Sequence, residues 1–552
     1  VEFELNAIGR KLLGKDFKAG RGSGPKTPVA GAEAADETGD EAAPELKTIV
    51  DVKHDYQLIT KPAEWKKLIG GLEKKKSFCF DLETTGLDPR SAQVLGLAFS
   101  CKSGSACYVS LPHDPAEAKA ALEEFRPLLE NPKIEKIGHN LKYDLSVLGW
   151  QGIDVNGPLF DTMLAHSLIE PDQRHKMDYL AEVYLAYTPI PISKLIGEKG
   201  DEQLGMALVP LEELADYAAE DADVTWQLHE KLKPLLKQHG QEKVFYEVEA
   251  PLIPVLAAME REGVRIDAEA LAEFSGELAE QIAAYQKEVF ELAGQEFNLA
   301  SPKQLGEILF DKLKLVDKPK KTKTGQYTTN EQTLIQLAPR HAIVQHLLDF
   351  RQASKLKSTY ADSLPNTIWS RTGRVHTTYN QAVTATGRLQ SQNPNLQNIP
   401  IRTAMGREIR KAFVPRDENH VLLSADYSQI ELRIIASISK DPGLVEAFEN
   451  GHDIHSATAA KVFQVPLEDV DADQRRTAKM VNFGLAYGMS AFGLSQRLGI
   501  PRREAAEIME EYFNQFPSLQ QYMTDTTEFA REHGYVETLT GRRRYLRDIT
   551  SR

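Results

Sequence analysis

VLLSADYSQIELRII, residues 421–435, carries the clearest structural signal in this sequence. An apolar run ends at Asp426, and an amphipathic segment follows at once. The pattern predicts a β-strand that ends at Asp426, and then a helix that buries Ile430, Ile434 and Ile435. A carboxylate held at the end of a strand can bind a divalent metal ion, and the backbone carbonyl of Tyr427 can supply another ligand.

The sequence RRTAKMVNFGLAYG, residues 475–488, predicts a second helix with an unusual face. Its Arg475, Lys479, Phe483 and Tyr487 are four residues apart, so on a helix they form one stripe. Two cations followed by two aromatic rings suit a triphosphate and a base. Phe and Tyr at this spacing are otherwise typical of a buried core, but two cations on the same face argue against complete burial.

Another set of acids lies closer to the N-terminus. Asp81 and Glu83 are two residues apart at the end of the strand-like FCFDLE, so both side chains leave the same face of a sheet. Asp144 follows in NLKYD, and Tyr217 and Asp221 are four apart in the helical YAAEDADV. Any one of these acids alone would be interpreted as a solvated surface residue. Together, four carboxylates suit the two divalent ions of phosphodiester hydrolysis.

The pattern of apolar residues predicts an α/β fold for the first half of the chain. Short strands are expected at 77–82, 94–100 and 106–111, and helices at 116–129, 160–169 and 211–236. Helical periodicity dominates from 244 to 364, and helices resume at 430 after a polar segment rich in Gly, Asn and Pro.

Composition excludes few functions. The net charge of −14 over 552 residues argues against a general nucleic-acid coat, but a local basic groove could still bind phosphates because screening confines each patch. Cys79, Cys101 and Cys107 lack metal-binding spacing and indicate a reduced, cytoplasmic protein. No apolar run is long enough to cross a membrane, and no signal segment opens the sequence.

Both motif sets resemble those of family A DNA polymerases of the bacterial type. FDLETTGL, NLKYD and YAAED resemble the family's RNase H-like 3′→5′ exonuclease domain, and residues 421–435 and 475–488 resemble its palm and fingers. The resemblance implies an α/β (α+β) fold with an exonuclease domain and a partial right-hand polymerase domain. The implied function is DNA-directed DNA synthesis with proofreading, in replication and repair.

The resemblance also implies roles for the acids of the exonuclease region. Asp81, Glu83, Asp144 and Asp221 would bind two Mg²⁺ ions, for which Mn²⁺ can substitute, and Tyr217, together with Glu83, would orient the attacking water. Asn140, in the same NLKYD motif, would contact DNA.

For the polymerase region, Asp426 and the carbonyl of Tyr427 would bind two further Mg²⁺ ions, and Glu431 would pack under the sugar and exclude a ribose 2′-hydroxyl. For the incoming deoxynucleoside triphosphate, Arg475 and Lys479 would bind the triphosphate. The ring of Phe483 would lie beside the nucleotide sugar, and that of Tyr487 would stack near the templating base. The plainer interpretation of Glu431 is an acid favoured by the helix dipole.

Two segments are expected to hold primer–template DNA. TATGRLQSQNPNLQNIP, residues 384–400, resembles the family's duplex-contacting segment, in which Arg388 would reach minor-groove acceptors that every base pair presents. The basic turn DKPKKTKTGQ, with Lys318, Lys320 and Lys321, matches a thumb tip that binds backbone phosphates. A merely solvated loop explains this turn equally well.

On this resemblance we divide the chain into five regions: 1–47, the tail of an upstream domain and a disordered linker; 48–240, exonuclease; 241–369, thumb and palm entry; 370–440, partial palm; 441–552, fingers. The chain ends before the family's second palm carboxylate, so we expect these residues alone not to polymerise at a useful rate. The expected protein is a bacterial, cytoplasmic, nucleoid-associated monomer. An exonuclease-only enzyme and a non-catalytic DNA-binding remnant remain alternatives.

Overall fold

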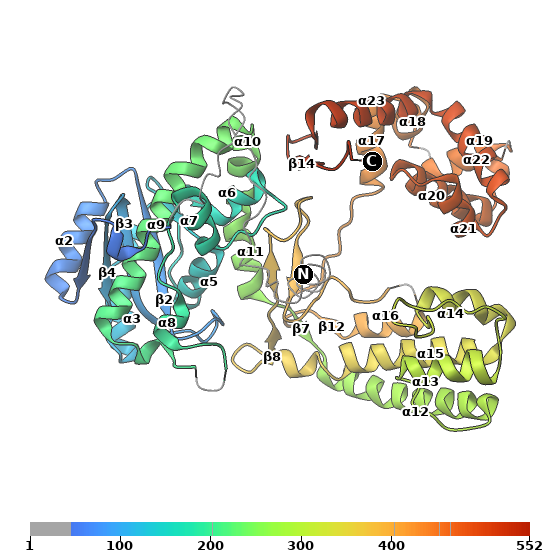
Figure 1. Cartoon of the computed structure of the whole chain (residues 1–552), viewed down its shortest axis with the longest axis horizontal. Coiled ribbons are helices and arrows are strands. Elements are labelled where there is room, and N and C mark those ends of the chain that lie inside the picture. The colour runs from blue at the N-terminus through green and yellow to red at the C-terminus, as the bar shows by residue number, and fades with distance from the viewer. Residues whose placement is uncertain (1–45, 201–202, 402, 452, 464, 552) are drawn as a thin grey trace, which may run out of the picture. The chain divides into compact units, whose positions relative to one another are not determined.

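The structure, a computed structural model, describes residues 46–552 except 201–202, 402, 452, 464 and 552. The linker predicted at 1–47 falls almost wholly outside these residues. Figure 1 shows the order of the helices and strands along the chain. None of the helices in the described part is long and apolar enough to cross a membrane.

A six-stranded mixed sheet forms the centre of the first domain, in the order β1-β4-β3-β2-β5-β6. Strand β3 pairs antiparallel with both β2 and β4, whereas β1–β4, β2–β5 and β5–β6 are parallel. The strands are β1 (Asp55–Ile59), β2 (Ser77–Thr84), β3 (Val94–Lys102), β4 (Ser105–Ser110), β5 (Glu135–Gly138) and β6 (Leu159–Asp161). The three strands predicted from sequence are β2, β3 and β4.

Helices pack around this sheet: α2 (Pro62–Leu72), α3 (Pro115–Glu123), α4 (Arg126–Leu129), α5 (Leu141–Gln151), α6 (Thr162–Ile169), α7 (Met177–Leu185), α8 (Ile192–Ile196) and α9 (Leu211–Gln238). The predicted helix at 116–129 is divided into α3 and α4. The one predicted from 160 begins two residues later, because residues up to Asp161 belong to β6 and the Asp161 side chain caps α6.

Alternation along β2 separates a core face from a functional face. Phe78 and Phe80 are fully buried and contact Phe99 or each other in the aromatic core. Asp81 and Glu83, on alternate positions, point to the other face of the sheet. The long helix α9 packs against β2, β3 and β4, and it brings its own acids to that second face.

A helical region follows the first domain. After α10 (Glu242–Val244) and α11 (Ala250–Glu262), an elongated set of helices packs around Val289, Leu305, Leu334 and Leu347. These helices are α12 (Ala268–Ala293), α13 (Pro302–Gly306), α14 (Glu331–Leu337) and α15 (Ala342–Leu356). Short elements then lead onward: β8 (Ile368–Trp369), β9 (Arg374–Val375), β10 (Thr378–Asn380), β11 (Gln390–Gln392), α16 (Ala404–Lys411) and β12 (Phe413–Val414), which pairs with β7 (Arg265–Ile266).

The strand predicted to end at Asp426 is wrong. Residues 415–427 form neither helix nor strand, and Val421 and Leu423 are 85% and 88% exposed. A strand persists only where its backbone groups pair with a neighbour, and no strand of the described residues lies alongside this segment. Apolar sequence alone therefore did not produce the strand.

The last region is helical and has its own core around Leu432, Val481, Leu494 and Tyr512. Its elements are α17 (Ile430–Ser439), α18 (Pro442–Glu449), α19 (Ile454–Val462), α20 (Ala472–Ala486), α21 (Ala491–Leu498), α22 (Arg502–Gln515) and α23 (Pro517–His533), followed by the hairpin β13 (Tyr535–Glu537) and β14 (Arg543–Tyr545).

The face of α17 that packs inward differs from the prediction. Leu432 and Ala436 are buried, Ile435 packs partly, and Ile430 and Ile434 are exposed at 40% and 36%. Because α17 is apolar over much of its circumference, its neighbours α20 and α23 select which stripe is covered.

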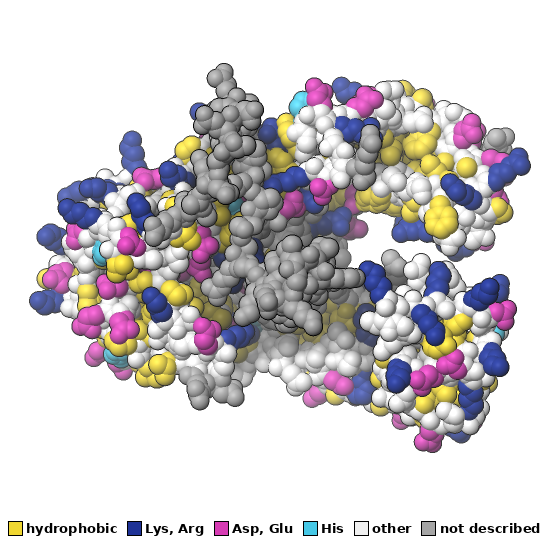
Figure 2. Space-filling model, in the orientation of Figure 1, with side chains coloured by type: hydrophobic (Ala, Val, Ile, Leu, Met, Phe, Trp, Pro, Cys, Tyr) yellow, Lys and Arg dark blue, Asp and Glu magenta, His cyan; other side chains and the backbone are white. Residues whose placement is uncertain are grey.

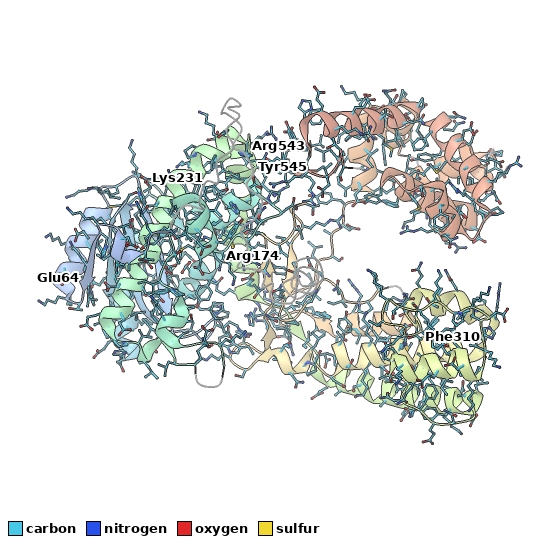
Figure 3. All side chains as sticks on the ribbon, in the orientation of Figure 1. Glu64, Arg174, Lys231, Phe310, Arg543 and Tyr545 are labelled. Atoms are coloured by element: carbon cyan, nitrogen blue, oxygen red, sulfur yellow. The ribbon has the colours of Figure 1, made fainter. Side chains whose placement is uncertain are left out.

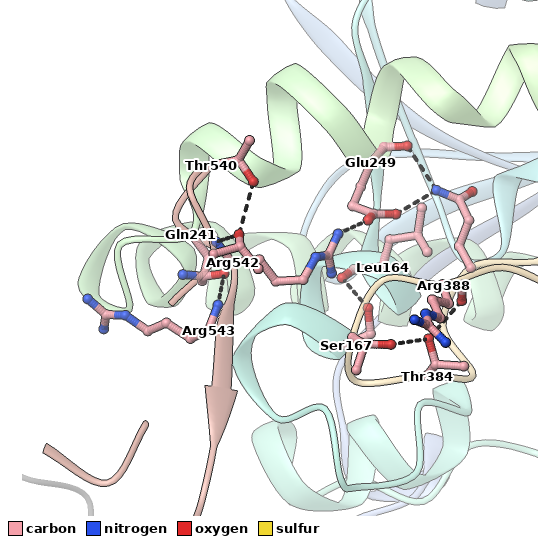
Figure 4. Close-up of polar contacts among 12 residues, drawn as sticks. Leu164, Ser167, Gln241, Glu249, Thr384, Arg388, Thr540, Arg542 and Arg543 are labelled. Atoms are coloured by element: carbon pink, nitrogen blue, oxygen red, sulfur yellow. Dashed lines mark hydrogen bonds and ion pairs between the residues drawn. The ribbon is translucent and has the colours of Figure 1, made fainter. Parts of the chain in front are cut away.

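The C-terminal hairpin contacts the segment from His239 to Glu249, which follows α9. Arg543 and Tyr545, labelled in Figure 3, lie on this hairpin, and the Tyr545 hydroxyl is 2.9 Å from His239 Nδ1. Figure 4 shows the Arg542 guanidinium directed at the Glu249 carboxylate, with which it forms a buried ion pair. Gln241 Nε2 donates to the Gly541 carbonyl at 2.8 Å.

Candidate functional site

Three carboxylates meet where α9 crosses β2. Asp81 and Glu83 come from β2 and Asp221 from α9, and one oxygen of each lies within 4.8 Å of the others. Glu83 and Asp221 are 5% and 8% exposed. Residues 140 positions apart in sequence thus form one oxygen-rich group, as the motif analysis predicted.

The fourth predicted acid, Asp144, lies beside this group. It is buried in the first turn of α5. The structure does not include it in the group of three, but the charge of Asp81 acts on it directly.

A further acid, Asp161, sets the start of α5. Its carboxylate accepts the N–H of Leu141 at 2.8 Å and of Asn140 at 3.2 Å, and it also caps α6. Asn140 adopts a left-handed conformation (φ 61°) and is exposed at the start of α5, the helix that carries Asp144 in its first turn. Sequence reasoning missed Asp161, although an acid directly before a helix is a typical N-cap signal.

Helix α9 carries three neighbouring acids, and their partners distinguish them. Glu220 accepts from the Tyr187 hydroxyl and from the Ile190 N–H at 2.6 Å. Asp223 accepts from the Tyr56 hydroxyl at 2.9 Å and the Gly104 N–H at 2.8 Å. In contrast, Oδ1 of Asp221 is buried without a partner among the described residues.

Burial makes this group reluctant to ionise. It raises the pKa of Asp81 to about 7. The pKa values of Glu83, Asp144 and Asp221 are also raised well above their usual range, first by burial and then by the charge of Asp81. A divalent cation would reverse this penalty, and carboxylate oxygens are the ligands that hard cations prefer. The unpartnered Asp221 oxygen and this donor set therefore fit a divalent metal ion.

Tyr217 stands one turn before Asp221 on α9. Burial, followed by the charge of Asp221, raises the pKa of Tyr217, so its hydroxyl stays protonated. The structure thus brings a protonated hydroxyl to the edge of the carboxylate group, where sequence analysis expected it.

Predicted polymerase residues from three segments also meet. The Tyr487 hydroxyl donates to Glu431, and an Arg388 nitrogen lies 3.7 Å from the same carboxylate. The rings of Phe483 and Tyr487 stack with their centroids 6.5 Å apart. Glu431 lies in the first turn of α17, Phe483 lies on α20, Tyr487 is the C-cap of that helix, and Arg388 belongs to the loop before β11.

Other predicted polymerase residues stand apart from this cluster. Asp426 and Tyr427 are exposed, and Asp426 has no ion pair or hydrogen bond within the described part of the chain. Arg475 Nε lies 2.5 Å from the carboxylate of Asp453, the N-cap of α19. Lys479 is exposed on the same face of α20. Sequence reasoning did not foresee the Asp453 pair.

The basic turn is ordered by backbone pairing. Lys321 pairs with Tyr327, and its ammonium lies 4.5 Å from the centre of that ring. Lys318 and Lys320 are exposed. Figure 2 shows Lys and Arg interspersed with Asp and Glu over the face in view, so basic binding surfaces on this acidic protein must be local.

Comparison with known proteins matches both halves of the chain. Residues 268–552 match the profile of DNA polymerase family A, and residues 56–237 match a 3′-5′ exonuclease profile. DNA polymerase I of Pseudomonas aeruginosa is 47% identical over 519 residues, which cover 92% of this chain and 56% of that protein. DNA polymerase I of Geobacillus stearothermophilus is 44% identical over 472 residues, covering 85% and 52%.

A solved structure agrees with these matches. The POL domain of Pol1 from M. smegmatis, in complex with DNA primer-template and dNTP, superposes with a TM-score of 0.79 at 36% identity. The alignment covers 90% of this chain and 82% of that one. Fold and carboxylate group together define a protein with an exonuclease domain joined to a polymerase domain. The chain belongs to DNA polymerase family A, and it spans about half the length of the curated relatives it matches. The predicted family and fold class are thereby confirmed.

We expect Mn²⁺ to stabilise this protein through the carboxylate group. At a Mn²⁺ concentration one hundred times the Kd, the unfolding free energy should rise by about 2.7 kcal/mol. The Asp81→Asn variant should lose most of this gain. Without metal it should be more stable than the parent, because one of the crowded buried charges is gone.

Thermal unfolding with and without Mn²⁺ measures both effects. Asp216→Asn, which removes an exposed acid from the same helix α9, is the matched control and should behave as the parent. Equal Mn²⁺ stabilisation of parent and Asp81→Asn would contradict the assignment.

Proposed function

We propose that residues 48–240 hydrolyse DNA from its 3′ end. The observation that carries this proposal is the group of Asp81, Glu83 and Asp221, whose oxygens lie within 4.8 Å of one another. Asp81 is half-buried, Glu83 and Asp221 are buried, and one Asp221 oxygen has no partner among the described residues. A protein keeps buried carboxylates unpaired only where something else balances their charge. The match to a 3′-5′ exonuclease profile over 56–237 supports the same activity.

In the proposed mechanism each acid has a task that its position allows. Asp81, Glu83, Asp144 and Asp221 would hold two Mg²⁺ ions, with Mn²⁺ as a substitute. Such ions, when bound, supply a hydroxide from water and stabilise the leaving 3′ oxygen. Tyr217, together with Glu83, would orient the attacking water, and Asn140 would contact the DNA strand.

We further propose that residues 370–552 form part of a polymerase site for primer–template DNA and deoxynucleoside triphosphates. The contact of Arg388, Glu431 and Tyr487 supports it, because these side chains come from distant segments and meet as the resemblance requires. Asp426 and the Tyr427 carbonyl would hold two Mg²⁺ ions. Phe483 would lie beside the nucleotide sugar.

The triphosphate would meet Arg475 and Lys479 on α20. In the structure Arg475 is paired with Asp453, and both side chains are partly exposed. A phosphate could therefore replace this carboxylate at a modest cost in free energy. The M. smegmatis structure, which holds DNA primer-template and dNTP, supports both ligand classes.

Further proposals concern the organisation of the protein. We propose a monomer of a bacterial cytoplasm, associated with the nucleoid, with thumb and palm entry at 241–369, palm at 370–440 and fingers at 441–552. The bacterial relatives support the setting. An exonuclease-only enzyme is disfavoured by the family match over 268–552. A DNA-binding remnant is disfavoured by the buried acids, which such a protein would have no reason to retain.

We predict that Asp81→Ala reduces 3′-end cleavage at least about a thousandfold, because each bound metal contributes several kcal/mol and about 1.4 kcal/mol changes a rate tenfold. The assay follows release of labelled nucleotides from single-stranded DNA in Mg²⁺ or Mn²⁺. Asp216→Ala, on the exposed face of α9, is the control and should cleave normally. An untouched 3′ end with the parent protein would refute the function.

We predict that Glu431→Ala weakens discrimination against ribonucleotides by about tenfold or more, because the carboxylate held by Tyr487 would no longer fill the space of a 2′-hydroxyl. The measurement is single-nucleotide extension with dNTP or rNTP by the protein expressed from its own gene, with Asp81→Ala to silence cleavage. Adding Asp426→Ala should stop extension.

Glu446→Ala, an exposed acid on the neighbouring helix α18, is the control for Glu431 and should keep the parent's discrimination. Equal discrimination by Glu431→Ala and the parent would count against the sugar-contacting role.

We predict that changing Lys318, Lys320 and Lys321 together to Ala flattens the salt dependence of primer–template binding. Loss of three phosphate contacts should reduce the log–log slope by about two to three. Replacing Lys74, Lys75 and Lys76, an exposed basic run outside the thumb, makes the same change in charge and should leave the slope as it was. If the triple variant at Lys318, Lys320 and Lys321 kept the salt dependence of the parent, this turn would be excluded from the DNA interface.

A further inference from the structure

Tyr108, on β4, has a buried hydroxyl without a hydrogen-bond partner among the described residues. The side chain is fully buried. Nearly all buried hydroxyl groups in proteins are hydrogen-bonded, so an unpaired one calls for a specific reason. The motifs that identified the exonuclease region do not include this tyrosine.

The register of the sheet places Tyr108 on the face that carries the metal-binding acids. Tyr108 pairs with Ala98 of β3, and Ala98 pairs with Asp81 of β2. Two residues along β3, Gly96 pairs with Glu83. Residues that pair directly across a sheet share a face, so this tyrosine and both acids lie on the same side.

Gly96 makes room for the tyrosine to lean toward Glu83. A Cβ atom at position 96 would collide with Cζ and Oη of Tyr108, so the end of the ring lies directly over that glycine. Apolar residues of α9 and the segment before it, including Leu214 and Ala218, cover the ring. The hydroxyl is therefore held over the strand position that is paired with Glu83.

Glu83 offers a matching acceptor. It is 5% exposed, and its carboxylate takes part in no hydrogen bond within the described residues. Burial first, and then the charge of Glu83, raises the pKa of Tyr108, so the hydroxyl stays protonated and can donate. A hydroxyl donor without a partner and a carboxylate without a hydrogen bond thus lie on the same face of the sheet, with the hydroxyl over the residue that pairs with Glu83.

We propose that Tyr108 is a positioning residue of the exonuclease site, whose hydroxyl donates a hydrogen bond to Glu83 and so directs the other carboxylate oxygen toward the metal-binding group. The inference rests on the proposed exonuclease function. A carboxylate has two oxygens, and one that ligates a metal is oriented by donors to the other.

Tyr108→Phe tests this proposal, because it keeps the ring and removes only the hydroxyl. The Mn²⁺ affinity that depends on Asp221, measured by electron paramagnetic resonance of free Mn²⁺, should fall about tenfold. The thermal midpoint of the metal-free variant should equal or exceed that of the parent, since no hydrogen bond is lost. Tyr512→Phe, a fully buried tyrosine in the core of the last helical region, is the control and should bind Mn²⁺ as the parent does.

A double-mutant cycle separates positioning from packing. If Tyr108 acts through Glu83, Tyr108→Phe should have no effect on Mn²⁺ affinity in a Glu83→Gln background. Three results would each overturn the inference. The first is an unchanged Mn²⁺ affinity in Tyr108→Phe alone, the second is additive losses of affinity in the cycle, and the third is a lower thermal midpoint of Tyr108→Phe without metal. If Asp221→Ala left the parent's Mn²⁺ affinity unchanged, the proposed function itself would fail, which distinguishes the two failures.

Discussion

The packing of α9 across β2 is the constraint on which the exonuclease half depends, because it forces like charges together in a buried volume. Asp221 would relieve its repulsion with Asp81 and Glu83 if the helix moved by half a turn. Contacts on either side of it prevent this movement: Glu220 is tied to Tyr187 and Ile190, and Asp223 to Tyr56 and Gly104. The fold therefore stores electrostatic free energy that a divalent cation would release.

Parts of the domain that do no chemistry maintain this arrangement. Asp161 satisfies the first N–H groups of α5 and α6 with one buried carboxylate, and so determines where Asn140 and Asp144 lie. Gly96 lets an aromatic ring cross β3 on the acidic face of the sheet. Small or polar residues that carry no catalytic signature thus set the positions of those that do.

The polymerase half shows a different balance. Three separate segments bring Arg388, Glu431 and Tyr487 together. In contrast, Asp426 lies in an exposed segment that pairs with no strand in the described part of the chain. Helix packing around Leu432 and Val481 is enough to assemble the nucleotide-facing side chains. A carboxylate at the end of a strand needs the rest of a sheet to be held in place.

Sequence by itself determined the features that depend on local periodicity: β2, β3 and β4, the long helix α9, the order of the four acids, and the cation–aromatic stripe of α20. Local pattern could not decide which neighbour each element meets. The pattern predicted a strand before Asp426 that had no partner strand. It also predicted that Ile430 and Ile434 of α17 are buried, whereas tertiary packing buries Leu432 and Ala436. It also could not distinguish Asp221 from Glu220 and Asp223, or foresee the Arg475–Asp453 pair. Only the tertiary structure decided these points, because hydrogen-bond partners and burial depend on residues far away in the chain.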